Sequence, residues 1–121
     1  MEDSYNKAVG GWGEALAGNF LRKRGYTIIA NNVRASFKEV DLVCWQEKIL
    51  VFVEVKTRIG DSLGAAIDMI GEKKILNLKQ AAISYVLRHK PKFEAIRIDF
   101  IAIDADRKKR TVKIRHYKDI S

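Results

Sequence analysis

The clearest pattern of apolar and polar positions lies between Glu39 and Lys56, where two runs rich in β-branched residues flank the charged pair Glu47-Lys48. Such a pattern predicts a β-hairpin. Successive side chains of a strand point to opposite faces of a sheet. The second strand is therefore expected to place Val51, Val53 and Val55 on one face and Leu50, Phe52, Glu54, Lys56 and Arg58 on the other.

The first strand of this hairpin is expected to follow the same rule. It places Phe37, Glu39, Asp41, Val43 and Trp45 on one face and Val40, Leu42 and Cys44 on the other. A loop centred on Glu47-Lys48 sets opposed residue numbers to a sum of 95, so that Asp41 faces Glu54 and Glu39 faces Lys56. A slip of one residue would turn the valines out of the core, so burial should fix this facing.

The remaining pattern predicts two helices and three further strands. A helical period over Lys7–Arg24 stops at Gly25, and a second over Glu72–His89 is ended by Pro91. Strands are expected at 26–33, 95–104 and 111–117, with a loop at 34–38 and a turn-rich segment at 57–64. The order α-β-β-β-α-β-β predicts an α/β sandwich with a central mixed five-stranded sheet.

Length and charge narrow the class of protein. With 121 residues and 47% hydrophobic content, we expect one domain spanning residues 1–121. A net charge of +8 favours a polyanionic partner, with nucleic acid first and an anionic membrane second. No apolar run approaches the roughly 20 residues of a membrane-spanning helix. The N-terminal Met-Glu-Asp-Ser-Tyr-Asn lacks the layout of a signal peptide, so we expect a cytoplasmic protein.

Cysteine and histidine offer little chemistry of their own. One cysteine, Cys44, excludes a disulfide framework and a cysteine zinc site within a single chain. His89 and His116 stand apart from residues that could complete a triad or a zinc cluster, so we expect both to be structural or solvated.

The charged end of the hairpin is the candidate site. Mg²⁺ prefers oxygen ligands and is held in many enzymes by one or two carboxylates and a substrate phosphate, a role for which Asp41 and Glu54 are suited. Lys56, two residues along the same face, is placed to neutralise developing charge or to orient a nucleophile. Glu39 either supports the site or forms an ion pair with Lys56.

Two groups on the predicted helices are open to two interpretations. Glu14 lies off the apolar stripe of the first helix among Gly10, Gly11, Gly13 and Gly18, and by its pattern alone it is a solvated helix acid. Lys73, Lys74 and Lys79 form either a solvated helix face or a set of phosphate contacts.

Several motifs together resemble a known family. They are Gly13-Glu14 with Ala17, Gly25-Tyr26, Asn32 followed by Arg34, Glu39-Val-Asp-Leu-Val43, Val51-Phe-Val-Glu-Val-Lys-Thr-Arg58 and Arg97-Ile-Asp-Phe100. The chain resembles the small bacterial YraN-type proteins of the PD-(D/E)XK nuclease superfamily, which have a restriction-endonuclease-like fold and are similar to archaeal Holliday-junction resolvases. It departs from them in having Lys38 where a glycine is usual, and in lacking the proline before the first acid.

The resemblance implies a function and its residues. It implies Asp41 and Glu54 as metal ligands, Lys56 as the catalytic lysine and Glu14 as an additional acid, with Mg²⁺ as the cofactor and Mn²⁺ as a substitute. Nucleic acid is expected to contact Arg34, Lys38, Arg58, Lys73 and Lys74. The expectation is a metal-dependent DNA endonuclease, with branched DNA as a candidate substrate and a homodimer as a state that suits it. The alternatives are an inactive nucleic-acid-binding module of this fold and a protein-interaction factor.

Overall fold

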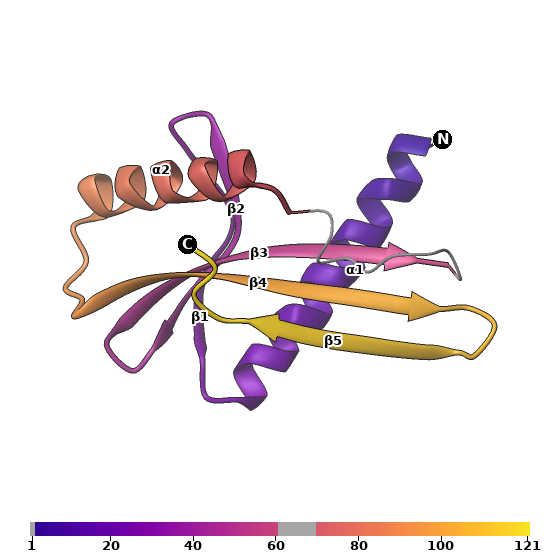
Figure 1. Cartoon of the computed structure of the whole chain (residues 1–121). Helices are drawn as coiled ribbons and strands as arrows, with labels where there is room; N and C mark the ends of the chain where they lie inside the picture. Colours follow the sequence, from indigo (N-terminus) through magenta and orange to yellow (C-terminus); the bar gives the residue numbers. More distant parts are fainter. Residues whose placement is uncertain (1, 61–69) are drawn as a thin grey trace.

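The computed structural model describes residues 2–60 and 70–121 and has two helices and five strands (Figure 1). The elements are α1 (Glu2–Lys23), β1 (Thr27–Ala35), β2 (Lys38–Gln46), β3 (Ile49–Ile59), α2 (Glu72–His89), β4 (Ala95–Asp106) and β5 (Thr111–Tyr117). The strands form one sheet in the order β1-β2-β3-β4-β5, in which only β3 and β4 are parallel. The predicted element order and the mixed five-stranded sheet are confirmed.

The two helices cover opposite faces of the sheet, which Figure 1 shows with α1 crossing behind β3, β4 and β5. The face under α1 buries Val51, Val53 and Val55 together with Ala17 and Leu21 of the helix. The face under α2 buries Leu50 and Phe52 together with Leu78, Ala81 and Ala82. Since β3 lies in the middle of the sheet and is buried on both faces, its alternate residues supply both cores.

The register of the β2–β3 hairpin agrees with the prediction over its paired length. Opposed residues run from Gln46 and Ile49 to Leu42 and Val53, each pair summing to 95 as expected. Glu47 takes a positive φ of 54° in the two-residue turn. The pairing ends at Leu42 and Val53, however, so Asp41 and Glu54, and likewise Glu39 and Lys56, are not cross-strand partners.

The facing of β2 also changes near this end of the ladder. Val40 packs in the α2 core with Val43, whereas Leu42 and Cys44 pack in the α1 core. The prediction that Val40 shares a face with Leu42 and Cys44 was therefore wrong. Strict alternation is lost between Val40 and Leu42, where β2 stops pairing with β3 but still pairs with β1.

Element boundaries differ from the predictions at several ends. Helix α1 begins five residues before the predicted Lys7, and Gly25 follows it at φ 88° as expected for a left-handed stop. Helix α2 has the predicted bounds, and β4 runs two residues beyond the predicted end. Residues 34, 35 and 38 belong to strands rather than a loop, and β3 runs through 57–59 of the predicted turn. Residues 61–64 of that turn lie outside the described part of the chain.

Candidate active site at the β2–β3 fork

The candidate site lies where β2 separates from β3, a place that we call the fork and that comprises Asp41 of β2 and Glu54, Val55 and Lys56 of β3. The Val55 amide, which β2 no longer pairs, donates to Asp41 Oδ2 at 2.8 Å. The carboxylate therefore takes the place of a ladder partner and satisfies an otherwise unpaired backbone group. This contact ties Asp41 to the segment of β3 that carries Glu54 and Lys56.

Helix α1 brings Glu14 to the fork because Gly13 allows a very close approach to β3. A Cβ atom on Gly13 would overlap the side-chain oxygen of Thr57. The glycine is thus a packing requirement, and it sets the height of Glu14 above the strand. Thr57 Oγ1 is buried here and has no hydrogen-bond partner among the described residues.

Glu14 is held as a strongly perturbed acid. Burial raises the pKa of Glu14 from 4.5 to about 7, with further rises from the charge of Asp41, a side-chain hydrogen bond with Asp41 and the charge of Glu39, against an opposing hydrogen bond with Asn32. Two neighbouring carboxylates repel each other, so the charge of Asp41 favours the protonated form of Glu14. Glu14 therefore lies close to Asp41 and is partly buried, and its role in the site stays a prediction.

Glu54 lies at the fork with a cation already beside it. Its side chain is only 3% exposed, and Oε2 lies 2.8 Å from Nζ of Lys74 on α2. That oxygen is buried and accepts no well-aligned hydrogen bond among the described residues, so the contact with Lys74 is an ionic one. A buried carboxylate oxygen that lacks aligned donors is the kind of group a metal cation would bind.

The other predicted site residues have mixed placements. Lys56 is half-buried on β3 directly after Val55. Glu39 pairs with Arg34 of β1, its neighbour in the ladder, at 2.9 Å on an exposed surface. An ion pair between Glu39 and Lys56 is therefore not formed, because β2 turns toward β1 at this point.

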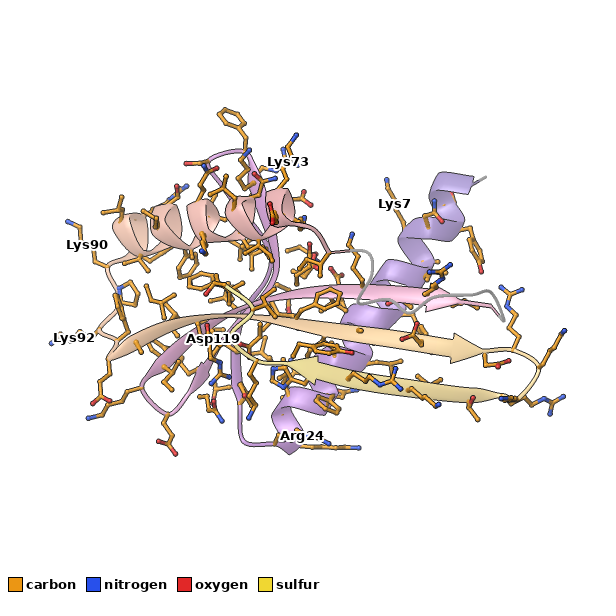
Figure 2. The ribbon with its side chains drawn as sticks, in the orientation of Figure 1. Lys7, Arg24, Lys73, Lys90, Lys92 and Asp119 are labelled. Atoms are coloured by element: carbon orange, nitrogen blue, oxygen red, sulfur yellow. The ribbon has the colours of Figure 1, made fainter. Side chains whose placement is uncertain are left out.

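The predicted nucleic-acid contacts also divide into groups. Lys73 is exposed, and Lys38 and Arg58 are half-buried. Lys74 and Arg34 are engaged with Glu54 and Glu39 respectively. Figure 2 shows Lys73 on α2 and Lys7 on α1, both extending from the upper side of the molecule in this view.

A pocket of about 410 Å³ adjoins Glu14 between α1 and β1. Its polar lining comes from Asn19, Arg22, Asn31 and Asn32. Asn32 takes a left-handed φ of 49° and hydrogen-bonds the Glu14 carboxyl group. The pocket therefore lies beside the Glu14 carboxyl group and offers amide and guanidinium groups.

The residues of the fork meet part of what a Mg²⁺ site requires. Among residues 2–60 and 70–121, no group of three or more His, Cys, Asp and Glu side chains is gathered closely enough to hold a metal ion. Mg²⁺ needs only one or two protein carboxylates when a phosphate and water complete its shell. Asp41 and Glu54 fit that smaller requirement in residue type and in sharing the fork, and their role as ligands stays a prediction.

A second cluster of charge, which sequence reasoning missed, lies on the α1 face of β4. Asp99 is fully buried and accepts from Arg97 Nε at 2.8 Å, Arg97 Nη2 at 2.9 Å, His116 Nε2 at 2.7 Å and the Asp119 amide at 3.0 Å. Arg97 also donates to Gln46 and Tyr26, both at 2.8 Å. His116 is thus structural, one of the two roles expected for it, although its contact with Asp99 was not predicted. The sequence signal that could have predicted this cluster was the presence of Arg97 and Asp99, two oppositely charged residues, on the same face of a buried strand.

Cys44 is inert in this structure. It is fully buried, and burial raises the pKa of its thiol to about 12. A thiol that stays protonated is a poor nucleophile and a poor metal ligand.

Comparison with known proteins decides the family. Residues 13–103 match the model of a family described as "Uncharacterised protein family UPF0102". The chain belongs to the UPF0102 family. A UPF0102 protein of Syntrophomonas wolfei is 42% identical over 98 residues, which are 81% of this chain and 85% of the relative. One of Caldicellulosiruptor bescii is 37% identical over 114 residues, or 93% and 96% of the two chains.

UPF0102 membership confirms the resemblance to the YraN-type proteins and to the PD-(D/E)XK-like nuclease group. The segment matched by the UPF0102 model contains Glu14, Asp41, Glu54 and Lys56 and leaves His116 outside. Neither of the helices in the described part of this UPF0102 chain is long and apolar enough to cross a membrane.

Proposed function

We propose that the protein is a divalent-metal-dependent DNA endonuclease that hydrolyses phosphodiester bonds, with branched DNA as the candidate substrate. The observation that carries the proposal is the meeting of Glu14 of α1 and Asp41 of β2, two acids from different elements, beside Glu54 and Lys56. Two neighbouring acids repel each other and destabilise the protein, and a bound cation would offset that repulsion. Such a pair therefore indicates a candidate cation-binding site. The net charge of +8 supports a polyanionic substrate.

Each residue has a defined part in the proposed reaction. Asp41 and Glu54 would hold Mg²⁺ or Mn²⁺, which when bound polarises the scissile phosphate and lowers the pKa of water. Lys56 places a positive charge where negative charge develops on the phosphate. Glu14 can give up its proton when a cation arrives, and it orients Asp41 through their hydrogen bond. The pocket lined by Arg22, Asn19 and Asn31 has room for a nucleotide next to the cleaved bond.

The test is cleavage of a panel of single-stranded, duplex, flap and four-way DNA with Mg²⁺ or Mn²⁺. We expect internal cuts that chelation abolishes and that Asp41→Asn and Glu54→Gln each remove. The two variants, purified in the same way, also control for contaminating nuclease. Absence of cleavage by the parent on every substrate, or cleavage by both variants at the parental rate, would overturn the proposal.

A second candidate is a nucleic-acid-binding module without turnover, and one observation favours it. Lys74 already neutralises the buried Glu54, which a metal would otherwise do. In that case Lys56 and Lys73 would bind phosphates, and Mg²⁺ would change neither DNA affinity nor melting temperature. A cytoplasmic location, a single domain and a homodimer remain predictions of the sequence.

A further inference from the structure

The turn that joins β1 to β2 carries an aromatic ring into solvent. Ala35 and Lys38 are ladder partners, so Ser36 and Phe37 form a two-residue turn. Phe37 is 93% exposed, the largest exposure of any large hydrophobic residue in the described chain. Burial of a phenylalanine is ordinarily favourable by about 1.5–3 kcal/mol, so its position in water calls for an explanation.

The backbone of this turn is also strained. Ser36 and Phe37 have φ of 50° and 64°, both left-handed. Two-residue hairpin turns of this kind favour Asn-Gly, because a β-carbon is disfavoured at such angles. A bulky residue held at a left-handed position is a feature from which a function can be inferred.

The tip is braced against the rest of the molecule. Ser36 Oγ lies 2.6 Å from Ser84 Oγ of α2, and the Arg34–Glu39 ion pair closes the ladder behind the turn. Lys38 follows Phe37 directly. Lys73 shares the helix face of Ser84, since residues eleven apart return to within about 20° of the same direction. A nucleic-acid base can stack on an exposed aromatic side chain such as Phe37, and lysine side chains such as Lys38 and Lys73 can bind the phosphates of the same strand.

We propose that Phe37 is a base-stacking residue that engages an unpaired or terminal base of the DNA held at the fork. The inference rests on the proposed function for its substrate. Asp41 lies four positions after Phe37 along the chain, a reach of at most about 13 Å. That reach equals the rise of about four stacked nucleotides. The ring would therefore mark a branch point or strand end within about four nucleotides of the cut.

The outer face of α2 could suggest a protein partner instead. Leu76, Ile83 and Leu87 are exposed there at 53%, 59% and 70%. They point about 80° around the helix from Ser84, so the braced tip and this stripe face different directions. Lys38 beside Phe37 and Lys73 on the Ser84 face of α2 supply positive charge that suits a polyanion. Leu87 serves as the matched control for a general apolar effect.

The experiment measures binding to DNA with Ca²⁺ in place of Mg²⁺, so that turnover is not needed. The probes are a flap, a four-way junction and a plain duplex, each with 2-aminopurine at the branch or terminal base. Phe37→Asn removes the ring and suits the left-handed turn, so it should fold at least as stably as the parent. Phe37→Trp keeps an aromatic surface. Leu87→Asn is the control.

Phe37→Asn should weaken binding to the flap and the junction about tenfold, leave duplex binding within about twofold, and abolish quenching of 2-aminopurine. Phe37→Trp should retain both signals, and Leu87→Asn should match the parent. If Phe37→Asn lost affinity equally for all three DNAs, or for none, the inference would be overturned. It would also be overturned if the substitution changed only the oligomeric mass of the protein. If the parent binds and quenches but never cleaves with Mg²⁺, the proposed nuclease fails while stacking stands. If the parent cleaves and Phe37→Asn cuts the same DNA equally well at the same position, only the stacking inference fails.

Discussion

Two groups of charged side chains lie against the same sheet and differ in how completely they are balanced. In the network around Asp99, every contact joins a donor to an acceptor, and a guanidinium offsets the buried carboxylate. At the fork, Glu14 and Asp41 set two acids against each other. Burial alone would raise the pKa of Asp99, but hydrogen bonds from His116, Arg97 and the Asp119 amide outweigh it and lower that pKa.

This difference in charge balance is the one expected between a structural cluster and a candidate functional site. A network with all its partners fixes β4, β5 and the C-terminal residues in one arrangement and gains nothing from a ligand. An unbalanced pair of acids lowers the stability of the free protein and is relieved when a cation binds. Residues that break local rules without internal compensation are the ones expected to serve a function.

The largest expected effect comes from making the same change at both places. Asp99→Asn leaves Arg97 buried without its counter-charge, so the free energy of unfolding should fall by about 3 kcal/mol. Asp41→Asn keeps an oxygen for the Val55 amide and removes a like charge from beside Glu14, so stability should hold or rise slightly. Urea unfolding at pH 7 without divalent cations measures both variants.

The comparison would fail if the two variants lost equal stability. That outcome would mean that the fork is a structural network as well. A double variant checks independence, because the two losses should add if the clusters do not interact.

The next effect concerns activity and contrasts two cations. Lys56→Ala should lower the cleavage rate about 100-fold with little change in DNA affinity or melting temperature, if the lysine acts in the transition state. Arg97→Ala should do the reverse, with a clear loss of stability and cleavage retained by the folded fraction. Lys48→Ala, in the exposed turn at the other end of β3, is the control. If Lys56→Ala cut DNA at the parental rate, the assignment of Lys56 as a catalytic residue would be wrong.

The fold followed closely from the sequence because its signals were local. The valines of β3 alternate with Leu50 and Phe52, and that alternation fixed which residues each helix covers. The bounds of α2 followed from an apolar stripe and Pro91. In the hairpin, a polar pair between two β-branched runs determined the register at every residue that is paired.

The details of the site depended on interactions that the sequence does not show. Extending the register predicted Asp41 opposite Glu54, but the Asp41 carboxylate accepts from the Val55 amide and the strands part there. The same register placed Glu39 opposite Lys56, but Glu39 pairs with Arg34, a residue that was expected in a loop. Lys74 was expected to meet phosphate, and its contact with Glu54 depends on how α2 packs on the sheet.

A smaller effect tests whether Lys74 stands where a metal would act. Lys74→Met removes the ammonium from beside the buried Glu54 and should lower the stability of the metal-free protein by about 1–2 kcal/mol. Millimolar Mg²⁺ should then raise the melting temperature of the variant more than that of the parent, because the cation replaces the lost charge. Lys73→Met, one residue away and exposed, is the control. Equal responses to Mg²⁺ in all three proteins would count against a metal at Glu54.

The smallest expected effect is the pH dependence of stability that Glu14 imposes. Its pKa is 4.5 in an ordinary setting and about 7 in the fold, so between these values the native protein keeps a proton that the unfolded chain has released. Stability from this group therefore falls as pH rises from about 4.5 to 7 and is level above that range. Asp99 acts in the opposite direction, because its lowered pKa gives stability that is lost only as the solution is acidified below about pH 4.

Glu14→Gln removes the first of these slopes and leaves the second. In metal-free buffer the variant should match the parent at pH 4 and exceed it by about 1 kcal/mol at pH 8, a modest gain because water screens a partly buried group. Thermal unfolding at half-unit pH steps measures the difference, with Glu72→Gln on the exposed start of α2 as the control. A constant difference between Glu14→Gln and the parent at all pH values would show that Glu14 titrates alike in the folded and unfolded chains. Glu14 and Asp41 would then not repel each other enough for a bound metal ion to stabilise the protein by offsetting that repulsion.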